Sequence, residues 1–304
     1  MTIHTILLPY DSGHRDARMG RGPLHLRERG ALDRLRAAGH DVIESLVEAP
    51  DAFPTEIGTS FALYRVLAED VRATVTGGAF PLTLAGNCGS ALGTVSGVRA
   101  ATPNDRSDVG VIWLDAHADF NTPETTATGF LDGTALAALA GHCWHTLTAS
   151  IPGFRPVSDA HVVLVGARDL DAGEETALAR SQIARVEAAR MQSDGAQAAL
   201  DDALTTLARR HISRVYLHID LDVHEPTDAQ ANQYAVPGGL SPSTVRDLVS
   251  VVADRFEISA AALTAYDPAY DADGRMLNVA LELMGRVASV SSRGTPRLRS
   301  GQAP

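Results

Sequence analysis

The chain contains no lysine, and all 26 of its basic residues are arginine. This absence excludes a Schiff base to pyridoxal phosphate and a P-loop phosphate site, because both depend on a lysine amine. Cysteine is nearly absent too: Cys88 and Cys143 are the only two. Such a chain has no disulfide framework and suits a reducing compartment. We therefore expect a cytoplasmic protein that depends on its core for stability.

Long apolar runs and excess positive charge are also missing. No run approaches the ~20 residues needed to cross a bilayer, and the N-terminal residues lack the basic and apolar regions of a signal peptide. The formal net charge is −11, whereas phosphate binding needs a clustered basic surface. We expect no membrane and no nucleic-acid partner, and instead a small-molecule substrate.

Strands and amphipathic helices are predicted to alternate along the chain. With 304 residues, 45% of them hydrophobic, it can bury a large core. Strands are expected at 6–9, 41–47, 80–85, 109–114, 161–165, 215–219 and 258–265, and helices at 24–38, 61–75, 89–98, 196–210, 244–256 and 275–290. This alternation predicts an α/β fold with a parallel sheet covered on both faces. Without repeats or linkers, residues 1–304 are expected to form one domain, with about 291–304 as a flexible tail.

Two acidic motifs directly follow two of the predicted strands. The first runs from Asp115 through His117 to Asp119, and the second is Asp220-Leu-Asp222. Within each motif, side chains two residues apart project to one side of an extended chain. In parallel α/β sheets, ligands bind outside the carboxyl ends of the strands, which is where both motifs fall.

The clustering of these acids predicts bound cations. Like charges repel, and the desolvation of each ion costs roughly several kcal/mol unless a counter-charge is present. Oxygen-rich sites with one nitrogen ligand suit divalent ions such as Mn²⁺, and carboxylates can bridge two of them. The residues therefore predict a two-metal site.

The first motif continues into Phe120-Asn121-Thr122-Pro123, and the segments Gly20-Arg21-Gly22-Pro23 and Gly238-Gly239-Leu240-Ser241 flank the two motifs in the chain. In this order the segments resemble the ureohydrolase (arginase and agmatinase) superfamily over nearly the whole chain. The resemblance implies a three-layer α/β/α fold with a doubly wound, mostly parallel sheet. It also implies two Mn²⁺ ions per chain and hydrolysis of a guanidino-type carbon.

The resemblance also implies roles for the individual ligands. Asp115 and Asp220 would bridge the two ions, Asp119 would hold one of them, and His117 and Asp222 the other. The last family ligand is a histidine, and Cys88 stands in its place, after Asn87 instead of an acid. A thiolate prefers softer ions, so Mn²⁺ is expected to bind it less tightly than imidazole. The alternative is an ordinary buried cysteine in a decayed site, or beside only one ion.

Substrate contacts follow from the same resemblance. Asn121, Thr126 and Thr128 occupy the places of the loop that binds the α-carboxylate in arginases. Asp171 and Glu174 match the acids that contact the α-amino group, and they also suit a helix N-terminus. The implied substrate is an intact, arginine-like α-amino acid. Asp119 is the implied catalytic proton carrier, with Asp132 as a weaker candidate.

Two departures argue against a plain arginase. Asp132 stands where arginases have a proton-shuttle histidine, and Ala265 where they have the glutamate that binds the guanidinium. Without that carboxylate, a charged guanidinium loses a charge-assisted hydrogen bond of about 1.5–3 kcal/mol. A less basic N-hydroxyguanidine depends less on this hydrogen bond. Asp267 is an alternative acid for the same place.

Three functions are therefore compared. Cysteine at a metal position resembles the subgroup of Nω-hydroxy-L-arginine hydrolases that act in D-cycloserine biosynthesis, which form hydroxyurea and L-ornithine. The second candidate is arginase or another guanidino ureohydrolase, and the third is a catalytically silent homologue. Because arginases are commonly trimers or hexamers, a homo-oligomer is a further expectation.

Overall fold

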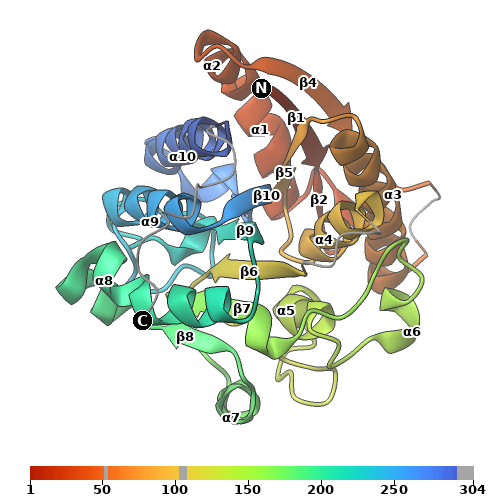
Figure 1. Cartoon of the computed structure of the whole chain (residues 1–304). Coiled ribbons are helices and arrows are strands. Elements are labelled where there is room, and N and C mark those ends of the chain that lie inside the picture. Colours follow the sequence, from red (N-terminus) through yellow and green to blue (C-terminus); the bar gives the residue numbers. More distant parts are fainter. Residues whose placement is uncertain (51–53, 103–107, 293–304) are drawn as a thin grey trace.

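A computed structural model describes residues 1–50, 54–102 and 108–292 of the chain (Figure 1). Its centre is an eight-stranded sheet in which all paired strands are parallel. From edge to edge, the strands are β4 (Asp41–Leu46), β1 (Thr2–Leu8), β5 (Phe80–Ala85), β10 (Glu257–Thr264), β9 (Arg214–Asp220), β6 (Val109–Leu114), β7 (Val162–Val165) and β8 (Ala184–Val186). A small hairpin, β2 (Tyr10–Asp11) and β3 (His14–Arg15), lies outside this sheet.

Helices cover both faces of the sheet (Figure 1). One face carries α1 (Gly22–Glu28), α2 (Ala31–Ala37), α8 (Ala188–Arg209), α9 (Pro242–Arg255) and α10 (Arg275–Ser291). The other carries α3 (Glu56–Thr76), α4 (Ser90–Ala101), α5 (Ala135–Leu139), α6 (His145–Thr148) and α7 (Ala172–Arg180). Short 3₁₀ helices are η1 (Arg18–Arg21), η2 (Asp132–Thr134), η3 (Asp159–His161), η4 (Leu221–Val223) and η5 (Pro268–Tyr270). The predicted three-layer α/β/α fold is confirmed.

The central strands are apolar because both of their faces are covered. Every residue of β5, β6 and β9 is buried, and two separate hydrophobic clusters pack on the two sides of the sheet. Parallel strands covered in this way read as continuous apolar runs, not as alternating patterns. This is why these strands are easily recognised in the sequence as continuous apolar runs.

The strand order decides where the functional loops meet. The chain runs outward from β1 to the edge strand β4, returns through β5, and then crosses to β6, β7 and β8 before β9 and β10 fill the centre. The loops after β5, β10, β9 and β6 therefore leave the sheet side by side. A ligand crevice is expected where the winding of an open sheet reverses.

Several predicted boundaries are wrong, and glycine explains two of them. The helix expected at 24–38 is two helices, α1 and α2, because Gly30 between them has a φ of 85°. The helix expected at 196–210 begins eight residues earlier, at Ala188, with a kink at Gly195 where φ is 79°. Only glycine adopts such angles without strain. The predicted tail starts inside α10, which ends at Ser291, and residues 293–304 lie outside the described ones.

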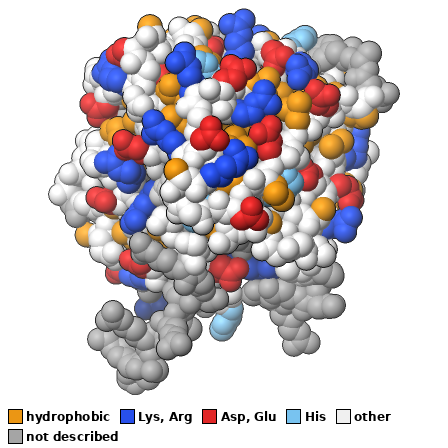
Figure 2. All heavy atoms as spheres, turned by 90° about the horizontal axis from the view of Figure 1, so that it is seen from above, with side chains coloured by type: hydrophobic (Ala, Val, Ile, Leu, Met, Phe, Trp, Pro, Cys, Tyr) orange, Lys and Arg blue, Asp and Glu red, His pale blue; other side chains and the backbone are white. Residues whose placement is uncertain are grey.

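The surface carries both signs of charge. Acidic and basic side chains are interspersed on the face shown in Figure 2, and pairs such as Arg36–Asp33 and Arg246–Glu282 link them on helices. Among the described residues, no helix has the length and apolar character needed to span a membrane.

Candidate active site

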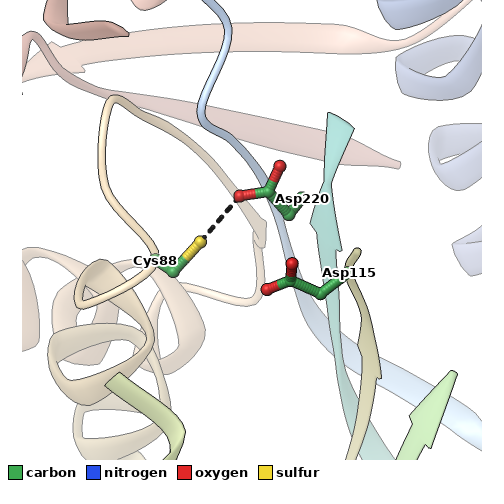
Figure 3. Close-up of side chains that lie close together, drawn as sticks. All are labelled: Cys88, Asp115 and Asp220. Atoms are coloured by element: carbon green, nitrogen blue, oxygen red, sulfur yellow. Dashed lines mark hydrogen bonds between the residues drawn. The ribbon is translucent and has the colours of Figure 1, made fainter. Parts of the chain in front are cut away.

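The two acidic motifs meet at the carboxyl ends of neighbouring strands. β6 and β9 pair in register, with Leu114 opposite Ile219, so Asp115 and Asp220 leave the sheet together. Cys88, in the loop after β5, reaches the same point, and its Sγ donates to Asp220 Oδ2 at 2.9 Å (Figure 3). Donor atoms of Cys88, Asp115 and Asp220 all lie within 4.8 Å of one another. This spacing allows all three to contact a single ion.

A second group of donors shares Asp115 with the first. It consists of Asp115, His117 and Asp222, again within 4.8 Å. His117 Nδ1 lies 3.3 Å from both Asp115 Oδ1 and Asp222 Oδ2. Burial alone would lower the pKa of His117, but Asp222 and Asp115 outweigh it and raise the pKa above its usual value. The two donor groups share Asp115, one of the two carboxylates predicted to bridge the ions, whereas Asp220 belongs to the first group alone and Asp119 to neither.

Asp119 provides the test of whether these residues fit cations. It is 8% exposed, and its Oδ2 has no hydrogen-bond partner among the described residues. Burial and then Asp115 raise its pKa well above the usual value, and burial and Asp222 do the same for Asp220. A buried carboxylate oxygen without a partner is costly. The acids therefore fit divalent cations, which would supply the missing counter-charge.

The loop that carries Cys88 is held from two sides. At Gly86, an added Cβ would lie 2.3 Å from the carbonyl oxygen of Tyr10, so the close approach of these segments requires glycine. Asp132 accepts hydrogen bonds from Cys88 N at 2.9 Å and from Gly89 N at 2.8 Å. Burial raises the pKa of the thiol well above its usual value, and Asp220 adds to the effect.

Asn87, which stands in place of an acid, and Asp132, which stands in place of a histidine, contact each other. Asn87 Nδ2 donates to Asp132 Oδ2 at 2.9 Å, and Asn87 Oδ1 accepts from Ser12 N at 2.8 Å. An acid at position 87 would place two carboxylates within hydrogen-bond distance, which is unfavourable without a shared proton. Burial raises the pKa of Asp132 to about 7. Both of its oxygens accept N–H donors, which favours a positioning role over the weaker catalytic prediction.

The predicted substrate residues line one pocket of about 380 Å³ beside the acids. They are Asn121, Thr126, Thr128, Asp171 and Glu174. Asp171 and Glu174 also form the capping box of α7, and Asn121 Nδ2 donates to Asp171 Oδ2 at 3.0 Å. The helix-terminus and pocket interpretations of these acids are thus compatible. Burial raises the pKa of Glu174 to about 7.

The pocket also contains residues that sequence reasoning missed. Phe130 and Tyr234 stack with ring centroids 5.4 Å apart, and Asn232 Nδ2 donates to the carbonyl of Ala265 at 2.8 Å. Asp169, which lies 3.9 Å from His117 Nε2, was missed as well. These residues lie on loops with no periodic sequence pattern. The only sequence signal for them is that each lies shortly before a motif described above.

Ala265 lines the pocket, whereas Asp267 does not. The carboxylate of Asp267 instead accepts a hydrogen bond from Ala269 N at 3.0 Å and caps η5. Ala265 has a φ of 62°, which is the left-handed region. The alternative in which Asp267 replaces the missing carboxylate therefore finds no support in the geometry.

Arg168 ties three loops together behind the second donor group. Its guanidinium donates to the carbonyls of Asp222 at 3.1 Å, Gly166 at 3.1 Å and Val236 at 2.8 Å. Lysine has no fork of donors with which to reach these carbonyls. The contacts assign Arg168 to positioning the backbone at Asp222.

We expect Arg168→Lys to destabilise the protein by about 1–3 kcal/mol, because partly buried carbonyls lose their donors. We also expect the Mn²⁺ concentration for half-saturation to rise by about tenfold. Thermal unfolding and Mn²⁺ titration measure the two effects. Arg246→Lys, at the exposed pair with Glu282, is the control. If Arg168→Lys changed stability and Mn²⁺ affinity no more than this control does, the positioning role of Arg168 would be contradicted.

The fold and the pocket define the class of protein: an α/β protein with a carboxylate-rich site at the ends of parallel strands. The model of the arginase family matches residues 2–289, and the chain belongs to this family. It is therefore an amidinohydrolase, which acts on guanidino C–N bonds. The family is binuclear in manganese, which agrees with the two donor groups.

Individual relatives agree with this assignment. The chain is 31% identical to the arginase of Bacillus caldovelox over 93% of this chain and 96% of that protein. It is 32% identical to the arginase of Brevibacillus brevis over 92% and 95%. The solved structure of the Bacillus caldovelox arginase superposes with a TM-score of 0.85 at 29% identity, covering 94% of this chain and 98% of that one.

Proposed function

We propose that this protein hydrolyses Nω-hydroxy-L-arginine to hydroxyurea and L-ornithine, as a step of D-cycloserine biosynthesis. The observation that carries the proposal is Ala265 in the wall of the pocket. Arginases have a glutamate there, and its absence penalises a fully charged guanidinium more than a less basic hydroxyguanidine. Cys88 in the donor group, which resembles the hydroxyarginine-cleaving subgroup, supports the same substrate.

The residues divide the work as follows. Cys88, Asp115, His117, Asp119, Asp220 and Asp222 would hold two Mn²⁺ ions, which would supply Lewis-acid chemistry and lower the pKa of the attacking water. Asn121, Thr126 and Thr128 bind the α-carboxylate, and Asp171 and Glu174 bind the α-amino group. These contacts fix the position of the hydroxyguanidino carbon relative to the donor groups.

Asp119 carries the proton that the leaving group needs. Water adds to the amidino carbon, the bond from that carbon to the δ-nitrogen breaks, and ornithine leaves as an amine once this nitrogen is protonated. The Asp119 carboxylate is buried beside Asp115, and whichever of its oxygens does not bind an ion would take a proton from water and pass it on.

The test is ornithine formation from Nω-hydroxy-L-arginine and from L-arginine, measured side by side with Mn²⁺-reconstituted protein. We expect the hydroxylated substrate to be cleaved with a kcat/KM at least about tenfold higher, because the missing hydrogen bond is worth about 1.5–3 kcal/mol to the charged guanidinium. Hydroxyurea and ornithine should form in equal amounts.

The competing functions predict other results. Equal or faster cleavage of L-arginine would make the protein an arginase with an unusual ligand. No turnover of either compound while two Mn²⁺ are bound would point to another guanidino substrate. No turnover and no bound metal would support a catalytically silent homologue.

A further inference from the structure

A chain of buried polar side chains runs from the core of the sheet to Cys88. Tyr216 OH lies 2.9 Å from His218 Nδ1, His218 Nε2 lies 3.3 Å from Thr264 Oγ1, and Thr264 Oγ1 lies 3.2 Å from Cys88 Sγ. All four residues are at most 2% exposed. Strand pairing brings these side chains together, since β9 carries Tyr216 and His218 while Thr264 ends β10, opposite Asp220.

The hydrogen bonds in this row of side chains have one favoured donor-to-acceptor direction, from Tyr216 towards Cys88. His218 is fully buried, and each of its two ring nitrogens faces a hydroxyl group, so a ring with a single proton can carry it on only one of these two sides. If that proton were on Nδ1, it would point at Tyr216, and the buried phenol proton would have no acceptor among the described residues. A buried donor without a partner costs about 1–3 kcal/mol. Tyr216 therefore donates to Nδ1, and the ring proton lies on Nε2.

The direction continues to the sulfur. His218 Nε2 donates to Thr264 Oγ1, which leaves the threonine proton free for another acceptor. Cys88 Sγ is 3.2 Å away, and the competing carbonyl of Ile219 is at 3.5 Å. Since the thiol already donates to Asp220, in the contact drawn as a dashed line in Figure 3, the sulfur can accept the bond from Thr264.

The imidazole cannot easily turn away from this arrangement. The ring of His218 stacks on Trp113 with centroids 3.7 Å apart and planes 15° from parallel. Trp113 is opposite His218 in the pairing of β6 and β9, and its Nε1 donates to Asp115 Oδ2 at 3.0 Å. The same pair of aromatic rings therefore supports two residues of the Cys88 donor group.

We propose that Thr264, oriented by His218 and Tyr216, is a positioning residue that donates a hydrogen bond to Cys88 Sγ and fits this sulfur to serve as a metal ligand. The inference rests on the proposed function, because it requires Cys88 to ligate. When an ion displaces the thiol proton, the sulfur becomes anionic and the bond from Thr264 becomes charge-assisted. Residues behind a ligand orient it and tune its affinity for the metal.

The experiment compares Thr264→Val, which removes the hydroxyl at nearly constant shape, with Thr264→Ser, which keeps it. Both full-length variants are loaded with Co²⁺, whose sulfur-to-metal charge-transfer absorption reports on the thiolate. We expect the valine variant to move this band to longer wavelength and to weaken Co²⁺ and Mn²⁺ binding about 10- to 100-fold. The serine variant should resemble the parent protein.

Two further variants make the outcome decisive. Tyr216→Phe removes the phenol that fixes the ring proton of His218 on Nε2, so it should shift the band in the same direction even if Thr264→Val fails to fold. Cys88→His should abolish the band. An unchanged band and unchanged affinity in both Thr264→Val and Tyr216→Phe, or no band in the parent protein, would overturn the proposal. None of these readouts uses a substrate, so the Co²⁺ result stands apart from failure of hydroxyarginine cleavage.

Discussion

Asp220→Asn is expected to lower kcat/KM by roughly 10³-fold or more, since loss of one metal would forfeit several kcal/mol of transition-state stabilisation. Asp220 lies next to Cys88 and Asp115 in one donor group and adjoins Asp222 of the other. An amide is a weaker ligand than a carboxylate for Mn²⁺. We therefore expect bound metal, measured by elemental analysis after dialysis, to fall from about two ions per chain toward one.

The same substitution should stabilise the fold of the metal-free protein, although it weakens metal binding. Without cations, burial and Asp222 raise the pKa of Asp220, so its charged form destabilises the fold at neutral pH. Removing that charge should stabilise the metal-free protein by about 1 kcal/mol or more. Thermal unfolding without Mn²⁺ measures the gain in stability of the metal-free protein, and thermal unfolding with Mn²⁺ measures the loss of stabilisation by the metal.

The exposed Asp247 of α9 offers the matched control. Asp247→Asn removes one negative charge from an exposed residue that does not line the pocket, and it should change neither metal content nor activity. The metal-site assignment would be wrong if Asp220→Asn kept two ions per chain and full activity.

Ala265→Glu is expected to raise kcat/KM for L-arginine by about 10- to 100-fold, which corresponds to the 1.5–3 kcal/mol of a charge-assisted hydrogen bond. The new carboxylate would enter the pocket that Ala265 lines. Because Ala265 already adopts a φ of 62°, the longer side chain adds little backbone strain. Activity on Nω-hydroxy-L-arginine should change much less, so the preference between the two substrates should narrow or reverse.

Ala265→Gln separates charge from shape in this test. The amide fills the same space but cannot form a charge-assisted bond to a guanidinium, so it should leave arginine cleavage near the parent level. Equal gains from glutamine and glutamate would show that pocket volume, and not the missing carboxylate, determines the selectivity. Steady-state kinetics on both substrates with Mn²⁺-loaded protein provide the comparison.

Glycine and loop residues account for most of what the sequence did not predict. Gly30 and Gly195 fit helical patterns by their neighbours, and only their backbone angles reveal a break and a kink. Phe130 and Tyr234 stack across the pocket from two distant loops. Apolar periodicity reports on burial within one element, so it carries no information on which loops come together.

The two acidic motifs show what the sequence by itself determined. The predicted period-two alternation within each motif is wrong, because Asp119 has a φ of 50° and Asp222 lies in η4, outside the strands. The apolar run before each motif is the local signal that places Asp115, His117 and Asp119 beside the carboxyl end of one strand, and Asp220 and Asp222 beside another. The alternation of strands and helices determined the layered architecture in the same way, because each element must bury its apolar face.

The tertiary structure alone decided which of these groups touch. Cys88 and Asp220 are 132 residues apart, and Cys88 and Thr264 are 176 apart, yet both pairs are in hydrogen-bond contact. The pair Asn87 and Asp132 compensates two departures that look independent in the sequence. These contacts arise from the order of β5, β10, β9 and β6 in the sheet. Strand order is set by the packing of the whole chain, and no local pattern encodes it.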